Sequence, residues 1–531
     1  MAPLACPVGS TLRPSCVTLG WRAPLGHLRP ACARQSLAAP CSTSAAWEAP
    51  RRCKPNSASC TPAAAASVAA PAPSSSSQPQ PQPLPRFDAP DRHGVRDATG
   101  RLLLKNLSLA EMEAWCVSVG ERPSRAPQLF EWMYGRRGEI VRSLGDAIKK
   151  GPGDEAAFGT AFLAKVDSSA SISGGLSLQA VHTALDGTTK LVFALNPDES
   201  GRLSGSVETV LIPMTNASGV IARYTACVSS QVGCAMNCQF CHTGRMGLLA
   251  NLSTAQIVEQ ILEARRWLVS SCPPELQMPI ANVVFMGMGE PFHNYDVVLA
   301  AVDVMAEPMG LKLSRNKIVV STVGLVPQMR AFLDAGKAKL ALSLHATTDE
   351  VRDWIVPVNR RYPLADLVAL LEEYFPTASA RGDRFIVIEY VMLAGVNDGA
   401  ADAERLAQLL ENVYCMINLI VYNPHDGTPF QRSSDADIAA FRRTLAAAGK
   451  VCTVRASKGD DTMAACGQLG DASAAARPGP RLDPPERLAG VVGRRASGGG
   501  GVGSAVFASA APAASAAVAG GSESGGCCSQ S

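Results

Sequence analysis

Acidic residues are almost missing from the first 87 residues of this 531-residue chain, where Glu48 is the only one. Ala, Ser, Pro and Arg dominate the same stretch. An Arg- and Ser-rich, acid-poor N-terminus is typical of a chloroplast or mitochondrial transit peptide. A secretory signal is disfavoured because no compact apolar core follows an early basic patch. We therefore expect residues 1–87 to be a transit peptide and linker, with a merely disordered extension as the alternative.

The chain also lacks a long apolar run, a large net charge and evenly spaced cysteines. No stretch of about eighteen strongly apolar residues occurs, so no membrane span is expected. The net charge of +3 is too small to identify a partner. The 17 cysteines are not spaced as in a secreted disulfide scaffold, since six lie in the leader and two, Cys527 and Cys528, near the end. A group of four from Cys227 to Cys241 indicates metal or redox chemistry in a reducing compartment.

From Thr225 to about Val454, short apolar runs alternate with helical patterns. This repetition predicts an α/β fold with a parallel sheet, in which ligands bind at the carboxyl ends of the strands. Six such strand–helix units would form a partial (β/α)6 barrel. The predicted strands are Ala226–Ser229, Asn282–Met288, Lys317–Thr322, Lys339–Leu344, Phe385–Met392 and Met416–Tyr422. The predicted helices include Thr254–Val269, Leu364–Tyr374, Ala400–Asn412 and Asp435–Ala448.

Residues 88–170 are predicted to form a small helical accessory domain. Ser108 and Glu111 make a capping-box pattern, in which the serine caps backbone N–H groups and the glutamate reaches back. Several arginines of this domain could contact phosphates, although a solvated face is the simpler interpretation. These arginines are Arg122, Arg125, Arg136 and Arg137. The predicted core residues are Trp115, Leu129, Phe130 and Trp132.

The chain after the accessory domain divides into three parts by its composition. Residues 171–224 alternate in polarity and carry a turn at Asp186-Gly187, which predicts a β-hairpin connector. The partial barrel is expected to occupy residues 225–470. Residues 471–531 are dominated by Ala, Gly and Ser, and we expect them to be a disordered tail.

Cys234, Cys238 and Cys241 form a C-x3-C-x2-C pattern directly after the first predicted barrel strand. Three thiolates on one short loop can hold three irons of a [4Fe-4S] cluster and leave the fourth iron open. An open iron can be chelated by the amino and carboxylate groups of S-adenosylmethionine (SAM). This spacing within a β/α repeat is the signature of radical-SAM enzymes.

Other interpretations of the same cysteines remain open. A zinc site would need a fourth ligand, for which His242 is a candidate, although structural zinc usually spreads its ligands as two pairs. The run Cys238-Gln-Phe-Cys241-His242 is formally a c-type haem attachment motif, but that motif ignores Cys234. A group of buried thiols without a ligand is the simplest alternative.

A glycine-rich turn and several polar residues follow later predicted strands. Glycines in Gly287-Met-Gly289-Glu290-Pro291 let backbone approach a ligand closely, and the carboxylate can receive the ammonium group of an amino acid. Polar residues at further strand ends could line the same pocket, although each alone is more often a cap or turn residue. They are Ser321, Ser343, His345 and Asn423.

A set of short motifs distributed over about residues 102–470 completes this pattern. They are Cys227-Val-Ser-Ser-Gln-Val-Gly-Cys234, Gly287-Met-Gly-Glu-Pro291, Ala341-Leu-Ser-Leu-His345, Ile388-Glu-Tyr-Val-Met392, Ile417-Asn-Leu-Ile420, Tyr422-Asn-Pro424, Gly459-Asp-Asp461 and Ala464-Ala-Cys466-Gly-Gln-Leu469. With these motifs the chain resembles the RlmN/Cfr family of radical-SAM adenine methyltransferases, which act on 23S rRNA.

The resemblance implies a role for each matching residue. Cys234, Cys238 and Cys241 would hold the [4Fe-4S] cluster. Cys466 would accept a methyl group and Cys227 would be its partner. Glu208 would be the proton acceptor. The residues implied to bind SAM are Gly289, Glu290, Ser321, Ser343, Leu344, His345 and Asn423.

The resemblance also implies a ping-pong mechanism that uses two SAM molecules. One SAM would methylate the Cys466 thiolate, which is a good nucleophile. A second SAM would yield a 5′-deoxyadenosyl radical that takes a hydrogen from this methyl group. The carbon radical would add to adenine and tether the RNA to the protein. After Glu208 removes the ring proton, Cys227 would attack the sulfur of Cys466 and release the product by forming a disulfide.

The expected function is therefore methylation of adenine C2 in large-subunit rRNA, with tRNA as a further substrate. Methylation of adenine C8, a zinc-containing RNA-binding protein and a haem electron carrier are the alternatives. The expected partners are the RNA and an electron donor such as flavodoxin or ferredoxin, the expected assembly is a monomer, and no membrane is involved. The leader favours a chloroplast location, with the mitochondrion as alternative.

Overall fold

The computed structural model describes residues 84–135, 140–144, 158–197, 205–379, 384–425, 428–470 and 479–493. The predictions for the leader up to residue 83, for Arg136 and Arg137, and for Cys527 and Cys528 lie outside the described residues. Within the part that the structure describes, no helix combines the length and the apolar character needed to cross a membrane.

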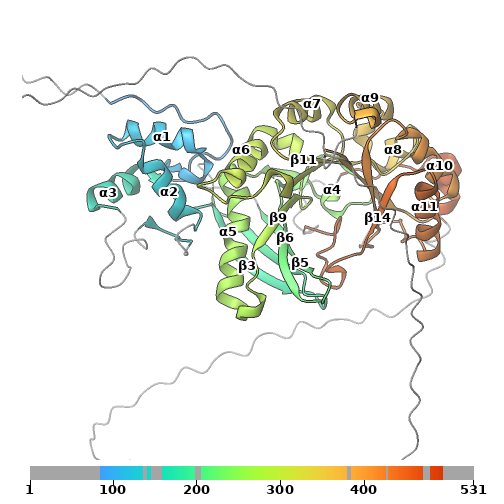
Figure 1. The fold of residues 1–531 in the computed structure, drawn as a ribbon, viewed down its shortest axis with the longest axis horizontal. Helices are drawn as coiled ribbons and strands as arrows, with labels where there is room; N and C mark the ends of the chain where they lie inside the picture. Colours follow the sequence, from blue (N-terminus) through green and yellow to red (C-terminus); the bar gives the residue numbers. More distant parts are fainter. Residues whose placement is uncertain are drawn as a thin grey trace, which may run out of the picture. The chain divides into compact units, whose positions relative to one another are not determined.

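The described residues are organised around one ten-stranded sheet with the order β14-β13-β12-β11-β10-β9-β6-β5-β4-β3 (Figure 1). From β6 to β14 every neighbouring pair is parallel, whereas β3, β4, β5 and β6 pair antiparallel. The predicted α/β class with a partial parallel barrel is confirmed. The parallel strands are β6 (Ile221–Cys227), β9 (Ile280–Phe285), β10 (Ile318–Thr322), β11 (Lys339–Ser343), β12 (Ile386–Met392), β13 (Cys415–Val421) and β14 (Val451–Arg455).

Helices alternate with these strands along the chain, because a parallel sheet needs crossover connections and buries its apolar strands beneath helices. The strand β12 illustrates this, since all of its residues but one are buried. The helices of this part are α4 (His242–Met246), α5 (Thr254–Ser271), α6 (Tyr295–Ala306), α7 (Val326–Ala335), α8 (Asp349–Ile355), α9 (Leu364–Tyr374), α10 (Ala400–Leu409) and α11 (Asp435–Ala447).

The antiparallel strands extend the barrel sheet rather than standing apart from it. They are β3 (Leu176–Thr183), β4 (Thr189–Leu195) and β5 (Ser206–Thr215). Beside the first barrel strand, β5 pairs with β6 in a register that sets Val210 opposite Cys227. A separate antiparallel pair of short strands, β7 (Gln231–Cys234) and β8 (Gly247–Asn251), flanks the segment that carries Cys234, Cys238 and Cys241. We call the segment from Cys234 to Cys241 the cysteine loop.

The accessory domain consists of α1 (Leu109–Ser118), α2 (Arg125–Met133) and α3 (Thr160–Ser169), with the short strands β1 (Leu102–Leu103) and β2 (Ala170–Ser171). The predicted capping box of Ser108 and Glu111 is confirmed at the start of α1. The four aromatic and aliphatic residues expected in its core are all buried. They are Trp115, Leu129, Phe130 and Trp132.

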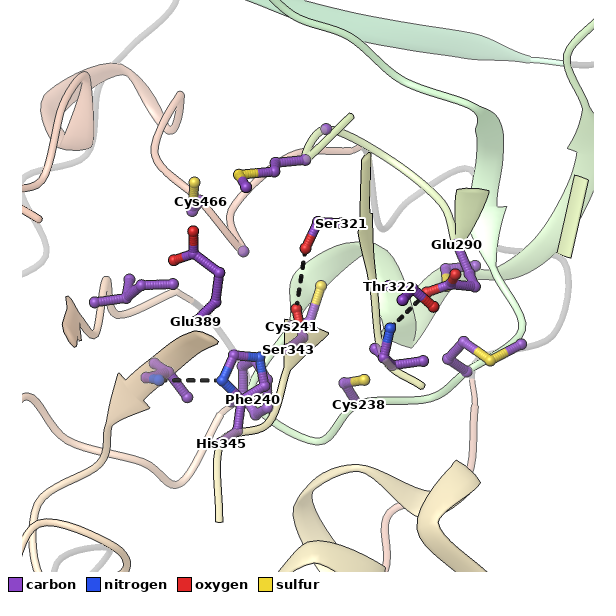
Figure 2. Close-up of a pocket in the computed structure, with 18 of the residues that line it drawn as sticks. Cys238, Phe240, Cys241, Glu290, Ser321, Thr322, Ser343, His345, Glu389 and Cys466 are labelled. Carbon is purple, nitrogen blue, oxygen red and sulfur yellow. Dashed lines mark hydrogen bonds between the residues drawn. The ribbon is translucent and has the colours of Figure 1, made fainter. Parts of the chain in front are cut away.

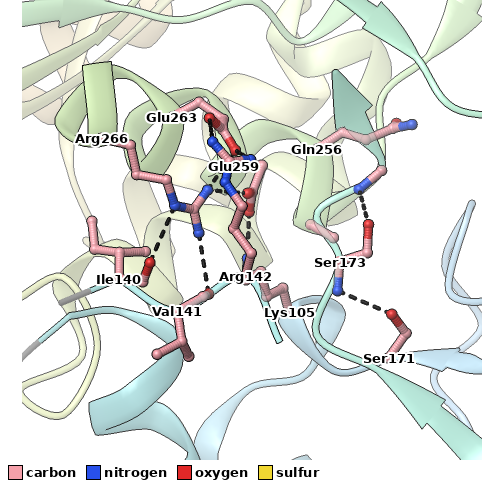
Figure 3. A network of polar contacts seen from close by, with 12 residues as sticks. Lys105, Ile140, Val141, Arg142, Ser171, Ser173, Gln256, Glu259, Glu263 and Arg266 are labelled. Carbon is pink, nitrogen blue, oxygen red and sulfur yellow. Dashed lines mark hydrogen bonds and ion pairs between the residues drawn. The ribbon is translucent and has the colours of Figure 1, made fainter. Parts of the chain in front are cut away.

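A network of buried charges joins this domain to α5 (Figure 3). Lys105 Nζ lies 2.5 Å from Glu259 Oε2, and their side chains are only 1% and 5% exposed. Arg266 Nη1 contacts Glu259 Oε1 at 2.7 Å and Glu263 Oε1 at 2.5 Å. Arg142 then pairs with Glu263 through both guanidinium nitrogens, at 2.6 and 2.9 Å. Each buried charge in this network therefore has a partner of opposite sign.

Replacing Glu259 by Gln is expected to destabilise the fold by about 3–5 kcal/mol, because Lys105 would keep a buried charge without its nearest carboxylate. The double variant Lys105→Met/Glu259→Gln removes both members of the pair and should be less destabilised than the single variant. Urea unfolding of the two variants and the parent chain measures this difference. If the free energy of unfolding of Glu259→Gln lay within about 0.5 kcal/mol of that of the parent chain, the proposed contribution of this ion pair to stability would be contradicted.

The prediction that residues 471–531 form only a disordered tail is wrong for residues 479–493. This segment is ordered and ends in α12 (Glu486–Gly493). Inside the Ala/Gly/Ser-rich composition, Leu482, Leu488 and Val491 supply apolar side chains, and Leu488 is only 4% exposed. The composition of residues 471–531 taken as a whole does not reveal such a short stretch with a few apolar residues.

Candidate active site

The three cysteines of the C-x3-C-x2-C pattern lie on the loop between β7 and α4. Cys234 ends β7 and Cys241 is the residue before α4, so the flanking elements fix both ends of the loop. All three side chains line one cavity of about 150 Å3, and all three are free thiols. Figure 2 shows Cys238 and Cys241 facing this cavity.

These thiols are held where an ionised group is unfavourable unless a cation is bound. Burial raises the pKa of Cys234, Cys238 and Cys241, and the neighbouring cysteines raise the pKa of Cys238 further. Among the described residues, no three His, Cys, Asp or Glu side chains converge on one point in the manner of ligands to a single ion. Cys234, Cys238 and Cys241 line the same cavity, and three thiolates of one short loop can each bind a different iron of a [4Fe-4S] cluster.

The glycine-rich turn after β9 packs directly against the start of β7. Gly289 has a φ of 101°, and a Cβ added there would lie 2.6 Å from Gln231 Cβ. Only glycine therefore allows this approach. The following residue, Glu290, receives the N–H groups of Phe292 and Val323, both at 3.0 Å. Burial raises the pKa of Glu290 to about 7 despite these donors. A buried carboxylate in this setting would gain strongly from an ammonium partner.

Three further predicted SAM residues share this cavity at the ends of β10 and β11 (Figure 2). The hydroxyl groups of Ser321 and Ser343 lie 3.3 Å apart across the two strands. His345 has a φ of 62°, and its Nδ1 accepts the N–H of Val391 at 3.1 Å. Burial and the nearby Arg352 lower the pKa of His345 to about 3. His345 is therefore a neutral ring whose Nε2 carries the proton.

The last two predicted SAM residues are placed differently from each other. Asn423 lines the cavity, and its Nδ2 donates to the carbonyl of Cys466 at 3.2 Å. Leu344 is fully buried in the core and does not line the cavity. Its N–H donates to Glu389 and its carbonyl accepts from Arg352 Nε, so both backbone groups of Leu344 are already paired.

Cys227 and Cys466 are 239 positions apart in the sequence, and the fold brings them to one small cavity. That cavity has a volume of about 20 Å3, so little more than one water fits between its walls. Cys466 lines this cavity and the larger one, whereas Cys227 lines only the smaller. Both residues therefore line one small cavity, which shares Cys466 with the larger cavity of the three loop cysteines.

Glu208 lies beside the loop that carries Cys466. Its Oε2 accepts the N–H of Gly470 at 2.9 Å, and its Oε1 pairs with Lys190 at 3.2 Å. Glu208 lines neither cavity, although Val210, two positions along the same strand, lines the smaller one. The structure thus connects Glu208 to the Cys466 loop through the backbone at Gly470.

Two charged residues of the site have no role in the sequence analysis. Glu389 on β12 lines the larger cavity and accepts Asn418 Nδ2 at 2.9 Å, with its carboxyl group turned toward Cys466 in Figure 2. Arg455, the last residue of β14, lines both cavities. Glu389 carries a signal in the sequence, because a charged residue inside an apolar strand needs a partner.

The arginines proposed for phosphates are partly engaged within their own domain. Arg125 donates to Gln128 Oε1 at 2.9 Å and lies over the ring of Phe162 at 5.5 Å. Arg122 is exposed. Neither contact favours an RNA surface over the simpler interpretation of a solvated face.

Comparison with protein families gives two matches. The radical SAM superfamily matches residues 228–410, a range that contains the cysteine loop and most of the cavity. The ribosomal RNA large subunit methyltransferase N-terminal domain matches residues 103–143 in the accessory domain.

Curated relatives match about two thirds of this chain. The dual-specificity RNA methyltransferase RlmN of Geotalea uraniireducens is 40% identical over 366 residues, which are 69% of this chain and 96% of the relative. The protein of the same name from Geobacter sulfurreducens is 41% identical over 366 residues, covering 69% of this chain and 91% of the relative. Among solved structures, a radical SAM methyltransferase from Sphaerobacter thermophilus is 37% identical with a TM-score of 0.58, and the match covers 69% of this chain and 98% of that one.

Proposed function

This chain belongs to the RlmN/Cfr family of radical-SAM RNA methyltransferases, and from that membership we propose that it methylates C2 of one adenosine in large-subunit rRNA. The relatives are named dual-specificity enzymes, which supports a second RNA substrate, for which tRNA is our candidate. The observation that carries the proposal is the meeting of Cys466 and Cys227 beside the cavity that the three loop cysteines line.

Family membership implies a [4Fe-4S] cluster and SAM as cofactors. Cys234, Cys238 and Cys241 would hold the cluster, which supplies the electron for reductive cleavage of SAM. Glu290 would receive the ammonium group of SAM, and the neutral Nε2–H of His345 and the hydroxyls of Ser321 and Ser343 offer hydrogen bonds. Gly289 and Asn423 complete the residues that would bind SAM, whereas Leu344, which does not line the cavity, would only hold its neighbours Ser343 and His345 in place.

Cys466 would carry the methyl group between the two halves of a ping-pong reaction. It lines both the larger cavity, where SAM would bind, and the smaller cavity that it shares with Cys227. The electron-poor C2 of adenine resists polar methylation, so a carbon radical formed on this methyl group would attack it. Loss of the ring proton to Glu208 and return of the unpaired electron to the oxidised cluster would then leave a closed-shell adduct between Cys466 and the RNA. The hydrogen bond from the N–H of Gly470, four residues beyond Cys466, holds the Glu208 carboxylate beside this loop.

Cys227 would release the product. Its thiolate would attack the sulfur of Cys466, forming an S–S bond as the bond between that sulfur and the RNA-bound carbon breaks. The electron pair left on this carbon would delocalise into the adenine ring and take up a proton, giving the methyl group. A dithiol reductant would then restore both thiols for the next turnover.

Incubation of the full chain with a reconstituted cluster, SAM, a reductant and unmodified large-subunit rRNA tests the proposal. Mass spectrometry of the digested RNA against authentic nucleosides is expected to show 2-methyladenosine. The appearance of 8-methyladenosine instead would contradict the assignment of C2. The absence of any methyladenosine from protein with an intact cluster would contradict the substrate.

Three accompanying features are part of the same proposal. We propose a chloroplast location from the acid-poor leader, with the mitochondrion as alternative. We also propose flavodoxin or ferredoxin as electron donor and a monomeric enzyme. Import of the leader fused to a fluorescent protein into isolated plastids or mitochondria would distinguish the two locations.

A further inference from the structure

An ordered segment near the end of the described chain lies on the outside of the cysteine loop. We refer to residues 479–491 as the C-terminal strap. Its backbone is bonded to the loop at two points: Asn237 Nδ2 donates to the carbonyl of Pro480 at 2.8 Å, and the N–H of Leu482 donates to Gln239 Oε1 at 3.1 Å. A third bond, from the N–H of Gly479 to the carbonyl of Arg245 at 3.1 Å, joins the strap to α4.

The loop residues that contact the strap stand between Cys234 and Cys241 in the sequence. Asn237 precedes Cys238, and Gln239 follows it. Gln239 is only 2% exposed, and its N–H donates to the carbonyl of Ile355 at 3.0 Å. Gln239 is therefore held between α8 on one side and the strap on the other. Without the strap its buried side-chain amide would lose the N–H of Leu482 as a partner, which is costly.

The strap is also anchored to the barrel at points outside the loop. Trp354 Nε1 donates to the carbonyl of Leu482 at 3.0 Å, and Arg487 pairs with Glu350 at 2.8 Å. Both barrel residues belong to α8. Leu488 is 4% exposed, and Val491 approaches Gly395 closely enough that a Cβ there would lie 2.8 Å from its Cγ1. These contacts hold the strap in one position over the loop.

Apolar side chains of the strap complete a cluster that contains two of the three loop cysteines. Cys238 is buried in this cluster together with Trp354 and Leu488, and Cys241 and Leu482 pack against it. The shell around an iron–sulfur site controls the access of solvent and the local dielectric, and through them the reduction potential. A segment that finishes this shell therefore acts on the cluster without binding it.

We propose that the C-terminal strap is the outer wall of the iron–sulfur site, which fixes the cysteine loop and keeps water and oxygen away from the cluster. This inference rests on the proposed function, because it requires that the loop hold a cluster. Residues of the strap are positioning residues, since they touch the loop and not the reacting atoms.

The test compares three variants of the full chain after anaerobic reconstitution. Leu488→Asp places a charge in the buried contact and should release the strap. Trp354→Phe removes the N–H that holds the carbonyl of Leu482 and keeps a smaller aromatic ring in the same position. Ala489→Asp adds the same charge at an exposed position of α12 and serves as the control. Loss of the cluster absorbance in air-saturated buffer is recorded for each variant without SAM.

Leu488→Asp is expected to lose its cluster on the order of tenfold faster than the parent chain, because opening of the strap becomes more frequent. Trp354→Phe should show a smaller acceleration in the same direction, and Ala489→Asp should match the parent. The reduction potential of the cluster should rise in Trp354→Phe, which adds no charge, because admitted water stabilises the more negatively charged reduced form. A merely structural role of the strap would lower the thermal midpoint of the apo chain and leave the potential unchanged.

Equal cluster lifetimes and potentials in the parent, Leu488→Asp and Trp354→Phe would overturn the inference while leaving the enzyme assignment intact. If Leu488→Asp does not fold, the lifetime and potential of Trp354→Phe decide the matter alone. A parent chain that binds no iron and sulfide would instead contradict the proposed function, which separates the two failures.

Discussion

A Cys466→Ala variant is expected to form no methyladenosine above background, a loss of at least about 1,000-fold, because removal of a covalent carrier eliminates the route itself. The variant should still bind iron, sulfide and SAM, since Cys466 is not one of the three loop cysteines. Its fold should be little affected, because the thiol is half-buried at the edge of two cavities and leaves no closed void.

Nucleoside mass spectrometry after reaction with unmodified rRNA measures this effect. The matched control is Cys452→Ala, which removes another half-buried thiol, on β14, that lines neither cavity. We expect the control to keep the parent activity. Product formation by Cys466→Ala at a tenth of the parent rate or more, an order-of-magnitude threshold, would show that the methyl group does not travel through Cys466.

A Cys227→Ala variant is expected to stop at a different stage, with RNA covalently attached to the protein. Without the attacking thiol, the bond between the Cys466 sulfur and the RNA-bound carbon has no route to cleavage by thiol exchange. We therefore expect an adduct that resists denaturant, forms at up to one RNA per chain and prevents multiple turnover. Gel electrophoresis under denaturing conditions, with and without ribonuclease, detects it.

The residues around Cys227 affect how readily its thiol ionises, and only the ionised thiol can attack the sulfur of Cys466. Burial and the nearby Cys466 raise the pKa of the Cys227 thiol to about 12, and Arg455 opposes that rise. Arg455, which lines the smaller cavity, therefore favours the attacking thiolate form of Cys227. Cys415→Ala, which removes a buried thiol of β13 outside both cavities, is the control. Full turnover by Cys227→Ala, with no adduct, would contradict the release step.

The sequence was sufficient to predict six of the seven parallel strands in the described part of the chain and polar residues at their carboxyl ends, because both follow from local patterns. Apolar runs such as β12 are buried almost throughout, and residues directly after such strands, including Ser343 and His345, meet at one edge of the sheet. The approach of Cys227 to Cys466 came from family resemblance, since nothing local links positions so far apart.

Other features depend on tertiary contacts that no local pattern encodes. The strand β14 escaped prediction because it is short and largely exposed at the edge of the sheet. The strap was missed because its few apolar residues matter only through what they touch, such as the loop at Gln239. Glu389 and Arg455 became visible as site residues only when β12 and β14 were brought to the same cavity.

The most direct test of the central claim, that the methyl group passes through Cys466 as a radical, is an isotope measurement. The parent enzyme is given SAM whose methyl group carries only deuterium, and the methyladenosine is analysed by mass spectrometry. The account predicts a product methyl group with two of its three deuterium atoms, because one is taken during radical formation and replaced by a proton at release. The missing deuterium should appear in 5′-deoxyadenosine. A product that keeps all three deuterium atoms would mean direct transfer of an intact methyl group and would contradict the account.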